Sequence, residues 1–122
     1  FLCPIYPVVS MSAPCSHVRS RRGALGVWRQ WNREMRDSLS IEKQVRENCP
    51  PVFLVNCVDD PVVRYENSVI LDSALTALNV KHTYIQYKTG GHGFGASETK
   101  GTAESRQWKQ EFLTWISNFN RL

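Results

Sequence analysis

The sequence predicts an α/β fold in which helices flank a small parallel sheet. Strand-like and helix-like segments alternate along the chain, a pattern that builds parallel sheets through right-handed crossovers. Residues 52–58 (VFLVNCV) form a nearly continuous apolar run, typical of a central strand covered on both faces. The last two strand-like runs each end in a short motif with an ionisable side chain, at the edge where parallel sheets bind ligands.

The bulk composition is that of one ordinary globular domain. With 122 residues, 42% hydrophobic and 21% charged, the chain has room for one modest core, so we expect a single domain over residues 1–122. No stretch of about 18 apolar residues is present, and we expect no membrane partner. The cysteines match no zinc spacing and no glycine-rich loop matches a phosphate cradle, so we expect no metal and no cofactor. Cysteines in apolar runs behave as small hydrophobes, so we expect no functional disulfide. The cysteines are Cys3, Cys15, Cys49 and Cys57.

Residues 1–9 (FLCPIYPVV) are predicted to be the first strand. Pro4 and Pro7 remove donors from the hydrogen-bond ladder, which favours an irregular strand or one near an edge. The apolar run begins at Phe1 itself, without Met or a polar leader. We therefore expect the chain to begin partway into a larger protein.

Residues 12–48 are predicted to be an excursion from the sheet. Its basic part, 17–36, carries Trp28 and Trp31 among six arginines. This part is either a nucleic-acid patch with stacking aromatics or a surface segment with solvated arginines. We favour the surface segment and expect no nucleic-acid partner, because base-reading motifs are absent. Ser38 or Ser40 is predicted to begin a short helix that stops before Pro50.

Residues 50–122 are predicted to hold the acid-bearing strand, a helix, the histidine loop and a terminal helix. Helix 66–78 has apolar residues at three- and four-residue spacing, and Asn79 suits the left-handed conformation that ends a helix. Residues 82–87 are rich in β-branched and aromatic side chains, which predicts a strand. Helix 104–119 has one aromatic face, which we interpret as packing on the core. That face carries Trp108, Phe112, Trp115, Ile116 and Phe119.

The candidate catalytic residues are Asp60 and His92, each at the end of a predicted strand. Asp60 lies in the sequence DDP at 59–61, and His92 lies in GGHGFG at 90–95. If the two strands are parallel neighbours, both loops emerge at the same edge of the sheet and the two side chains can meet. A carboxylate that orients an imidazole provides two thirds of a Ser-His-Asp hydrolytic triad.

Simpler interpretations exist for both motifs. Asp and Pro favour turns, and a glycine-rich loop can carry an incidental histidine. We favour the functional interpretation because the two motifs occur together, in this order and at strand ends. Asp59 is the alternative carboxylate, and Asp60 is preferred because Pro61 fixes the turn directly after it. A structural role is expected for His17 and His82.

These segments resemble the α/β-hydrolase-fold esterases, above all the acetyl esterase and acetylxylan esterase-like group with the related dienelactone hydrolase and prolyl oligopeptidase-type enzymes. The acid-bearing segment carries the resemblance through PPVFLV at 50–55, DDPVV at 59–63 and ENS at 66–68. The histidine loop and the terminal helix also match, and YPVVSM at 6–11 looks like the strand after the nucleophile strand. The resemblance implies the C-terminal portion of an α/β-hydrolase sheet, with about three parallel strands.

By this resemblance Asp60 is the triad acid, His92 is the triad base, and residues 12–48 lie over the site. The implied function is the C-terminal part of a serine-type carboxylic ester hydrolase, acting on acetylated sugar, xylan or other short acyl esters. In this family the serine, in a G-x-S-x-G motif, precedes the acid and the base. The sequence contains no such motif, so we expect the serine upstream of Phe1 and little activity in this chain alone.

The alternative is an inert fragment or remnant whose only activity is association. An unpaired apolar edge at residues 1–9 would invite another chain to pair with it. We therefore expect a homo-oligomer, or pairing with an N-terminal half, through this edge. The sequence leaves the acyl group, the alcohol and the cellular compartment open.

Overall fold

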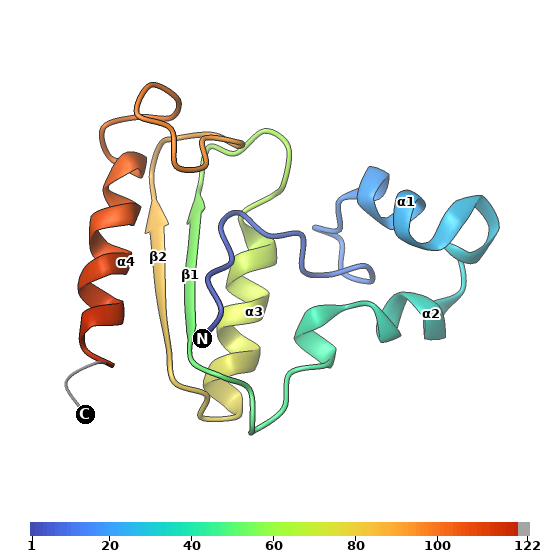
Figure 1. Ribbon diagram of the computed structural model, residues 1–122. Helices are drawn as coiled ribbons and strands as arrows, with labels where there is room; N and C mark the ends of the chain where they lie inside the picture. The colour runs from blue at the N-terminus through green and yellow to red at the C-terminus, as the bar shows by residue number, and fades with distance from the viewer. Residues whose placement is uncertain (120–122) are drawn as a thin grey trace.

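Two parallel strands form the regular part of the sheet in the computed structural model, which describes residues 1–119 (Figure 1). Strand β1 (Val52–Cys57) pairs with β2 (His82–Tyr87) in an unbroken register that runs from Val52 opposite His82 to Cys57 opposite Tyr87. Helix α3 (Glu66–Ala77) provides the crossover between them. The predicted α/β class and the parallel arrangement of these strands are confirmed.

Strand β1 is the centre of the core because all six of its residues are buried. Its alternate side chains point to opposite faces of the sheet. Val52 and Leu54 pack in one cluster with Leu71 and Leu75 of α3. On the other face, a second cluster packs against α4 (Trp108–Ser117). It includes Phe53, Val55, Cys57, Tyr87, Phe94, Phe112 and Trp115.

The predicted strand over residues 1–9 is only partly a strand. It makes two isolated parallel bridges with β1, Leu2 opposite Val52 and Ile5 opposite Val55. Pro4 has no amide proton to donate, and Tyr6 has a φ of +43°, which turns the chain away from extended geometry. The described residues therefore form two regular strands and one bridged segment, rather than three regular strands.

The excursion contains two helices that the sequence patterns did not predict, α1 (Val18–Arg29) and α2 (Arg33–Ser38). Leu25 is the one buried residue of α1, and α2 has no buried residue. The helix expected from Ser38 or Ser40 is a single 3₁₀ turn, η1 (Ile41–Lys43). Figure 1 shows α1 and α2 at the α3 side of the sheet. Their predicted position over the site stays a prediction.

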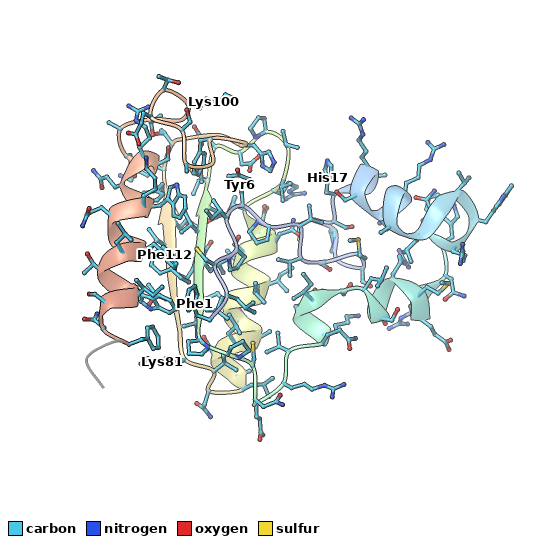
Figure 2. The ribbon with its side chains drawn as sticks, in the orientation of Figure 1. Phe1, Tyr6, His17, Lys81, Lys100 and Phe112 are labelled. Carbon is cyan, nitrogen blue, oxygen red and sulfur yellow. The ribbon has the colours of Figure 1, made fainter. Side chains whose placement is uncertain are left out.

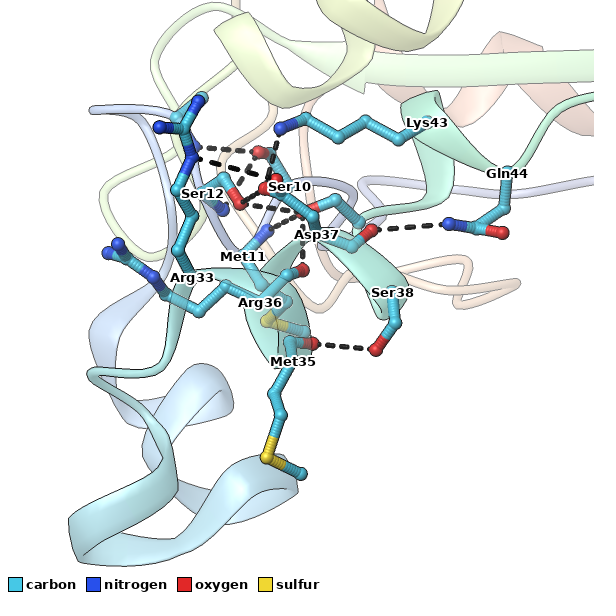
Figure 3. Close-up of polar contacts among 12 residues, drawn as sticks. Ser10, Met11, Ser12, Arg33, Met35, Arg36, Asp37, Ser38, Lys43 and Gln44 are labelled. Atoms are coloured by element: carbon cyan, nitrogen blue, oxygen red, sulfur yellow. Dashed lines mark hydrogen bonds and ion pairs between the residues drawn. The ribbon is translucent and has the colours of Figure 1, made fainter.

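A polar network around Asp37 attaches the excursion to residues 10–12 (Figure 3). The Asp37 carboxylate accepts hydrogen bonds from Lys43 Nζ and Ser12 Oγ, which hold its pKa below the usual range. The Met11 amide donates to Ser40 Oγ at 2.9 Å, and that hydroxyl donates to the Arg36 carbonyl at 2.8 Å. Ser40 therefore joins two segments instead of capping the 3₁₀ turn that follows it.

The predicted helices 66–78 and 104–119 are present. Asn79 has a φ of +53°, the left-handed conformation expected at the end of α3. A 3₁₀ turn, η2 (Ser105–Gln107), precedes α4. Figure 2 shows Phe1 and Phe112 close together, and their ring centroids lie 5.7 Å apart. Within residues 1–119, no helix has the length and hydropathy needed to cross a membrane.

Candidate active site

The loop after β1 fixes Asp60 through its own backbone. Asp60 Oδ1 accepts hydrogen bonds from the amides of Val62 at 2.8 Å and Val63 at 2.9 Å. This is the local turn that an aspartate followed by proline favours. The side chain is only 1% exposed, so its second oxygen has one fixed direction and is shielded from water.

The second carboxylate oxygen meets the imidazole of His92. Asp60 Oδ2 lies 2.7 Å from His92 Nδ1, across 32 positions of sequence. An ionised carboxylate only accepts hydrogen bonds, so the proton of this contact sits on Nδ1. The lone pair of the neutral ring is then on Nε2, on a side chain that is 26% exposed. The structure brings together the two residues that the sequence singled out, and it pairs His92 with Asp60 instead of Asp59.

Tyr6 is part of this site, and the sequence patterns did not single it out. Its ring centroid lies 4.4 Å from that of His92 and 5.0 Å from that of Phe94. Its hydroxyl oxygen accepts a hydrogen bond from the Gly95 amide at 3.2 Å. Its positive φ is uncommon for an aromatic residue and is the kind of backbone strain that gathers at functional sites. Figure 2 shows Tyr6 near the carboxyl ends of the strands.

The other two histidines have structural surroundings. His82 Nδ1 lies 2.7 Å from the Val80 carbonyl oxygen and Nε2 lies 2.9 Å from Asp72 Oδ1. Both ring nitrogens are thus engaged by neighbouring groups, which holds the ring of His82 in place. His17 caps the start of α1 through Nδ1, which accepts from the Ser20 amide. Within residues 1–119, His92 differs from both because its one hydrogen-bonding partner is a buried carboxylate, at Nδ1, and no partner is found at Nε2.

The thiol beneath the site is unreactive. Cys57 is fully buried at the end of β1, and burial together with the negative charges of Asp59 and Asp60 raises its pKa to about 12. At neutral pH it is therefore a protonated, apolar side chain and not a nucleophile. All four cysteines are free thiols. Among residues 1–119, no group of three His, Cys, Asp or Glu side chains has the arrangement of a metal site.

Known structures contain the same arrangement of strands and helices. The acetyl ester-xyloside bifunctional hydrolase of Caldicellulosiruptor lactoaceticus superposes on this chain with a TM-score of 0.88 at 27% identity, over 97% of this chain and 42% of the hydrolase. A carboxylesterase of Lactobacillus plantarum superposes with a TM-score of 0.74 at 19% identity, over 98% of this chain and 44% of the esterase. At 19% identity, the similarity to the carboxylesterase is one of fold alone.

Sequence comparison gives one curated relative. Over 88 residues the chain is 33% identical to endo-1,4-β-xylanase B of Butyrivibrio fibrisolvens, a match that spans 72% of this chain and 13% of the xylanase. No protein-family model matches the chain.

The chain has part of the α/β-hydrolase fold. The predicted resemblance is confirmed: the chain is similar in sequence and fold to the acetyl ester-xyloside hydrolase, and similar in fold to carboxylesterases. The chain spans 42% and 44% of the length of the two solved hydrolases described above.

Proposed function

We propose that this chain supplies the acid and the base of a serine-type carboxylic ester hydrolase. The contact between the buried Asp60 carboxylate and His92 Nδ1 is the observation that carries the proposal. It fixes the tautomer in which Nε2 can accept a proton, as a hydrolytic base must. The 27% identity to an acetyl ester-xyloside hydrolase supports esters of acetylated sugars or xylan, or other short acyl esters, as the substrates.

The proposed reaction needs a serine from outside these 122 residues, because the sequence contains no G-x-S-x-G motif. His92 Nε2 takes the proton of that serine hydroxyl while its oxygen attacks the ester carbonyl. The ring then returns the proton to the leaving alcohol, which leaves an acyl-serine. Water attacks the acyl-serine in the same way and releases the acid. Throughout, Asp60 holds the ring and stabilises the imidazolium by its charge.

A chimera tests this function. The part of the Caldicellulosiruptor hydrolase that this chain does not match is joined to the chain, and hydrolysis of p-nitrophenyl acetate is measured. We expect the chain alone to be nearly inactive and the chimera to be active, with a loss of at least about a thousandfold in His92→Ala. Acetate release from acetylated xylan then tests the substrate class. Equal rates for the chimera and its His92→Ala variant would remove His92 from the mechanism.

A second candidate function is association without catalysis, favoured by the open edge at residues 1–9. The Leu2 amide donates to the Pro51 carbonyl just before β1, and the Tyr6 amide donates to Val55 of β1. The amides of Cys3 and Ile5 have no hydrogen-bond acceptor within residues 1–119. An apolar groove of about 360 Å³ runs beside this edge, lined in part by Leu2 and Val45. We propose that a strand of another chain, either a second copy or an N-terminal half, pairs with this edge.

Sedimentation velocity tests the association. Leu2 at the edge is 49% exposed and Leu113 on α4 is 57% exposed, so lysine substitutions at these two positions form a matched pair. We expect Leu2→Lys to shift the chain toward monomer, because a charge at a sheet edge opposes pairing. Leu113→Lys should leave the association unchanged. A monomer at all concentrations would refute self-association.

A further inference from the structure

Two carboxylates bind four successive backbone amides in the loop that leads to His92. Glu104 accepts from the amides of Lys88 at 3.1 Å and Thr89 at 3.2 Å. Asp59 accepts from the amides of Gly90 at 3.3 Å and Gly91 at 2.9 Å. No residue in this run of four is left without an acceptor, although the loop lies at the surface. Hydrogen bonds to a charged acceptor are stronger than those between neutral groups.

The two adjacent aspartates bind two adjacent residues of the loop. Asp59 holds the main chain at Gly91, and Asp60 holds the side chain of His92. The loop after β1 is thus joined to the loop after β2 by two neighbouring hydrogen bonds, one to the Gly91 amide and one to the His92 imidazole. A rotation of the histidine loop that lengthened one of these contacts would also lengthen the other.

The glycines explain why such a contact is needed. Gly90 and Gly91 have φ values of +145° and +66°, and residues without a Cβ lose the most conformational freedom on folding. Gly90 is closely packed, because a Cβ there would lie 2.6 Å from Cys57 Sγ, but a Cβ on Gly91 would meet nothing within 4 Å. Packing therefore restrains the loop at Gly90, whereas at Gly91 the restraint comes from the Asp59 carboxylate.

We propose that Asp59 is a positioning residue for His92. By binding the Gly91 amide, its carboxylate fixes the position of the backbone next to His92 and the direction of the side chain, so that Nδ1 meets Asp60 Oδ2. The hydrolytic consequence rests on the proposed function, whereas the position of the ring is measurable without any activity. Glu104 makes the same kind of contact three and four residues before His92, and it stabilises the loop without directing the ring.

The test is the His92 Nδ1 proton, observed by NMR in the chain as it stands. Asp59→Ala should speed the exchange of this proton with water by about tenfold or more, because the ring no longer stays on Asp60. Glu104→Ala removes two amide contacts from the same loop and is the matched control, expected to leave the exchange within about twofold. Asp59→Asn keeps one acceptor oxygen and should restore part of the protection. Asp60→Ala removes both carboxylate oxygens and defines the fully uncoupled ring.

Two outcomes overturn the proposal: unchanged exchange in Asp59→Ala, or equal acceleration in Asp59→Ala and Glu104→Ala. Amide exchange in β1 and β2 shows whether a variant is folded. If Asp59→Ala is not folded, Asp59→Asn takes its place in the comparison with Glu104→Ala. In the chimera, Asp59→Ala should lower kcat by about tenfold with KM little changed, since small misplacements of a catalytic group are costly. A chimera without His92-dependent hydrolysis, alongside the expected exchange rates, would refute the proposed function and leave the positioning role standing.

Discussion

The rings of Tyr6 and His92 lie 4.4 Å apart, centroid to centroid, and Tyr6 reaches this position with a φ of +43°. This contact connects the bridged segment at the start of the chain to the histidine loop, and its two residues are 86 positions apart in the sequence. The contact has two parts that mutation can separate: the ring face against the imidazole, and the hydroxyl oxygen that accepts from the Gly95 amide.

Tyr6→Phe separates these parts. It keeps the ring and removes the acceptor for the Gly95 amide, so the free energy of unfolding should fall by about 1 kcal/mol. Urea denaturation measures this change. Tyr65→Phe is the control, because the hydrogen bond found for Tyr65 with a side chain uses its backbone carbonyl, which the substitution keeps. Its effect should stay within about 0.5 kcal/mol. Equal effects in the two variants would mean that the hydrogen bond at Gly95 contributes nothing.

Asn67 should be among the residues most costly to replace. Its side chain is fully buried, and Oδ1 accepts from the amides of Val9 and Ser10, each at 3.1 Å. Its Nδ2 donates to the carbonyls of Cys15 at 2.9 Å and Arg64 at 3.1 Å. Asn67→Ala leaves the Val9 and Ser10 amides and the Cys15 carbonyl unpaired and should lower the free energy of unfolding by about 2–4 kcal/mol. Chemical denaturation checks it, and a loss below about 1 kcal/mol would contradict it.

Gly90 and Gly91 should differ sharply in their tolerance of alanine. At Gly90 a Cβ would lie 2.4 Å from Ser105 Cβ, on a backbone with positive φ. Overpacking and strain together should cost about 3 kcal/mol or more in Gly90→Ala. Gly91→Ala meets open space and should cost only the left-handed backbone penalty, about 1–2 kcal/mol. Thermal unfolding of the two variants makes the comparison, and the reverse ranking would contradict the packing at Gly90.

The buried Cys57 thiol should make the protein less stable in alkali. Its pKa rises from 9.0 to about 12 in the folded state, through burial and the charges of Asp59 and Asp60. Because the unfolded chain loses this proton first, the contribution of Cys57 to the free energy of unfolding should be constant below pH 9 and should fall between pH 9 and 12. Cys57→Ala should show a shallower fall over the same range in urea titrations. The pKa values of Tyr84 and Cys3 are also raised by burial, so part of the fall in stability remains in Cys57→Ala.

The parts of the fold that the sequence predicted are those with a regular pattern of burial. The apolar run at 52–58 predicted the central strand because every side chain of β1 is buried. Helices α1 and α2 gave no comparable signal, since their arginine-rich faces are solvated and Leu25 is the one side chain of these helices in the core. The first segment was predicted as a full strand because its composition is apolar, but the left-handed φ of Tyr6 cannot be read from composition.

For the site, the sequence by itself determined which residue types stand at the ends of the two strands. Asp59, Asp60 and His92 follow from turn and strand patterns that act over a few neighbouring residues. Only the tertiary structure decided that Asp60 meets the imidazole while Asp59 meets the Gly91 amide, and that Tyr6 lies against the ring. These contacts depend on the register between β1 and β2 and on the direction of each loop. Both are set by packing among residues far apart in the chain, which no local pattern records.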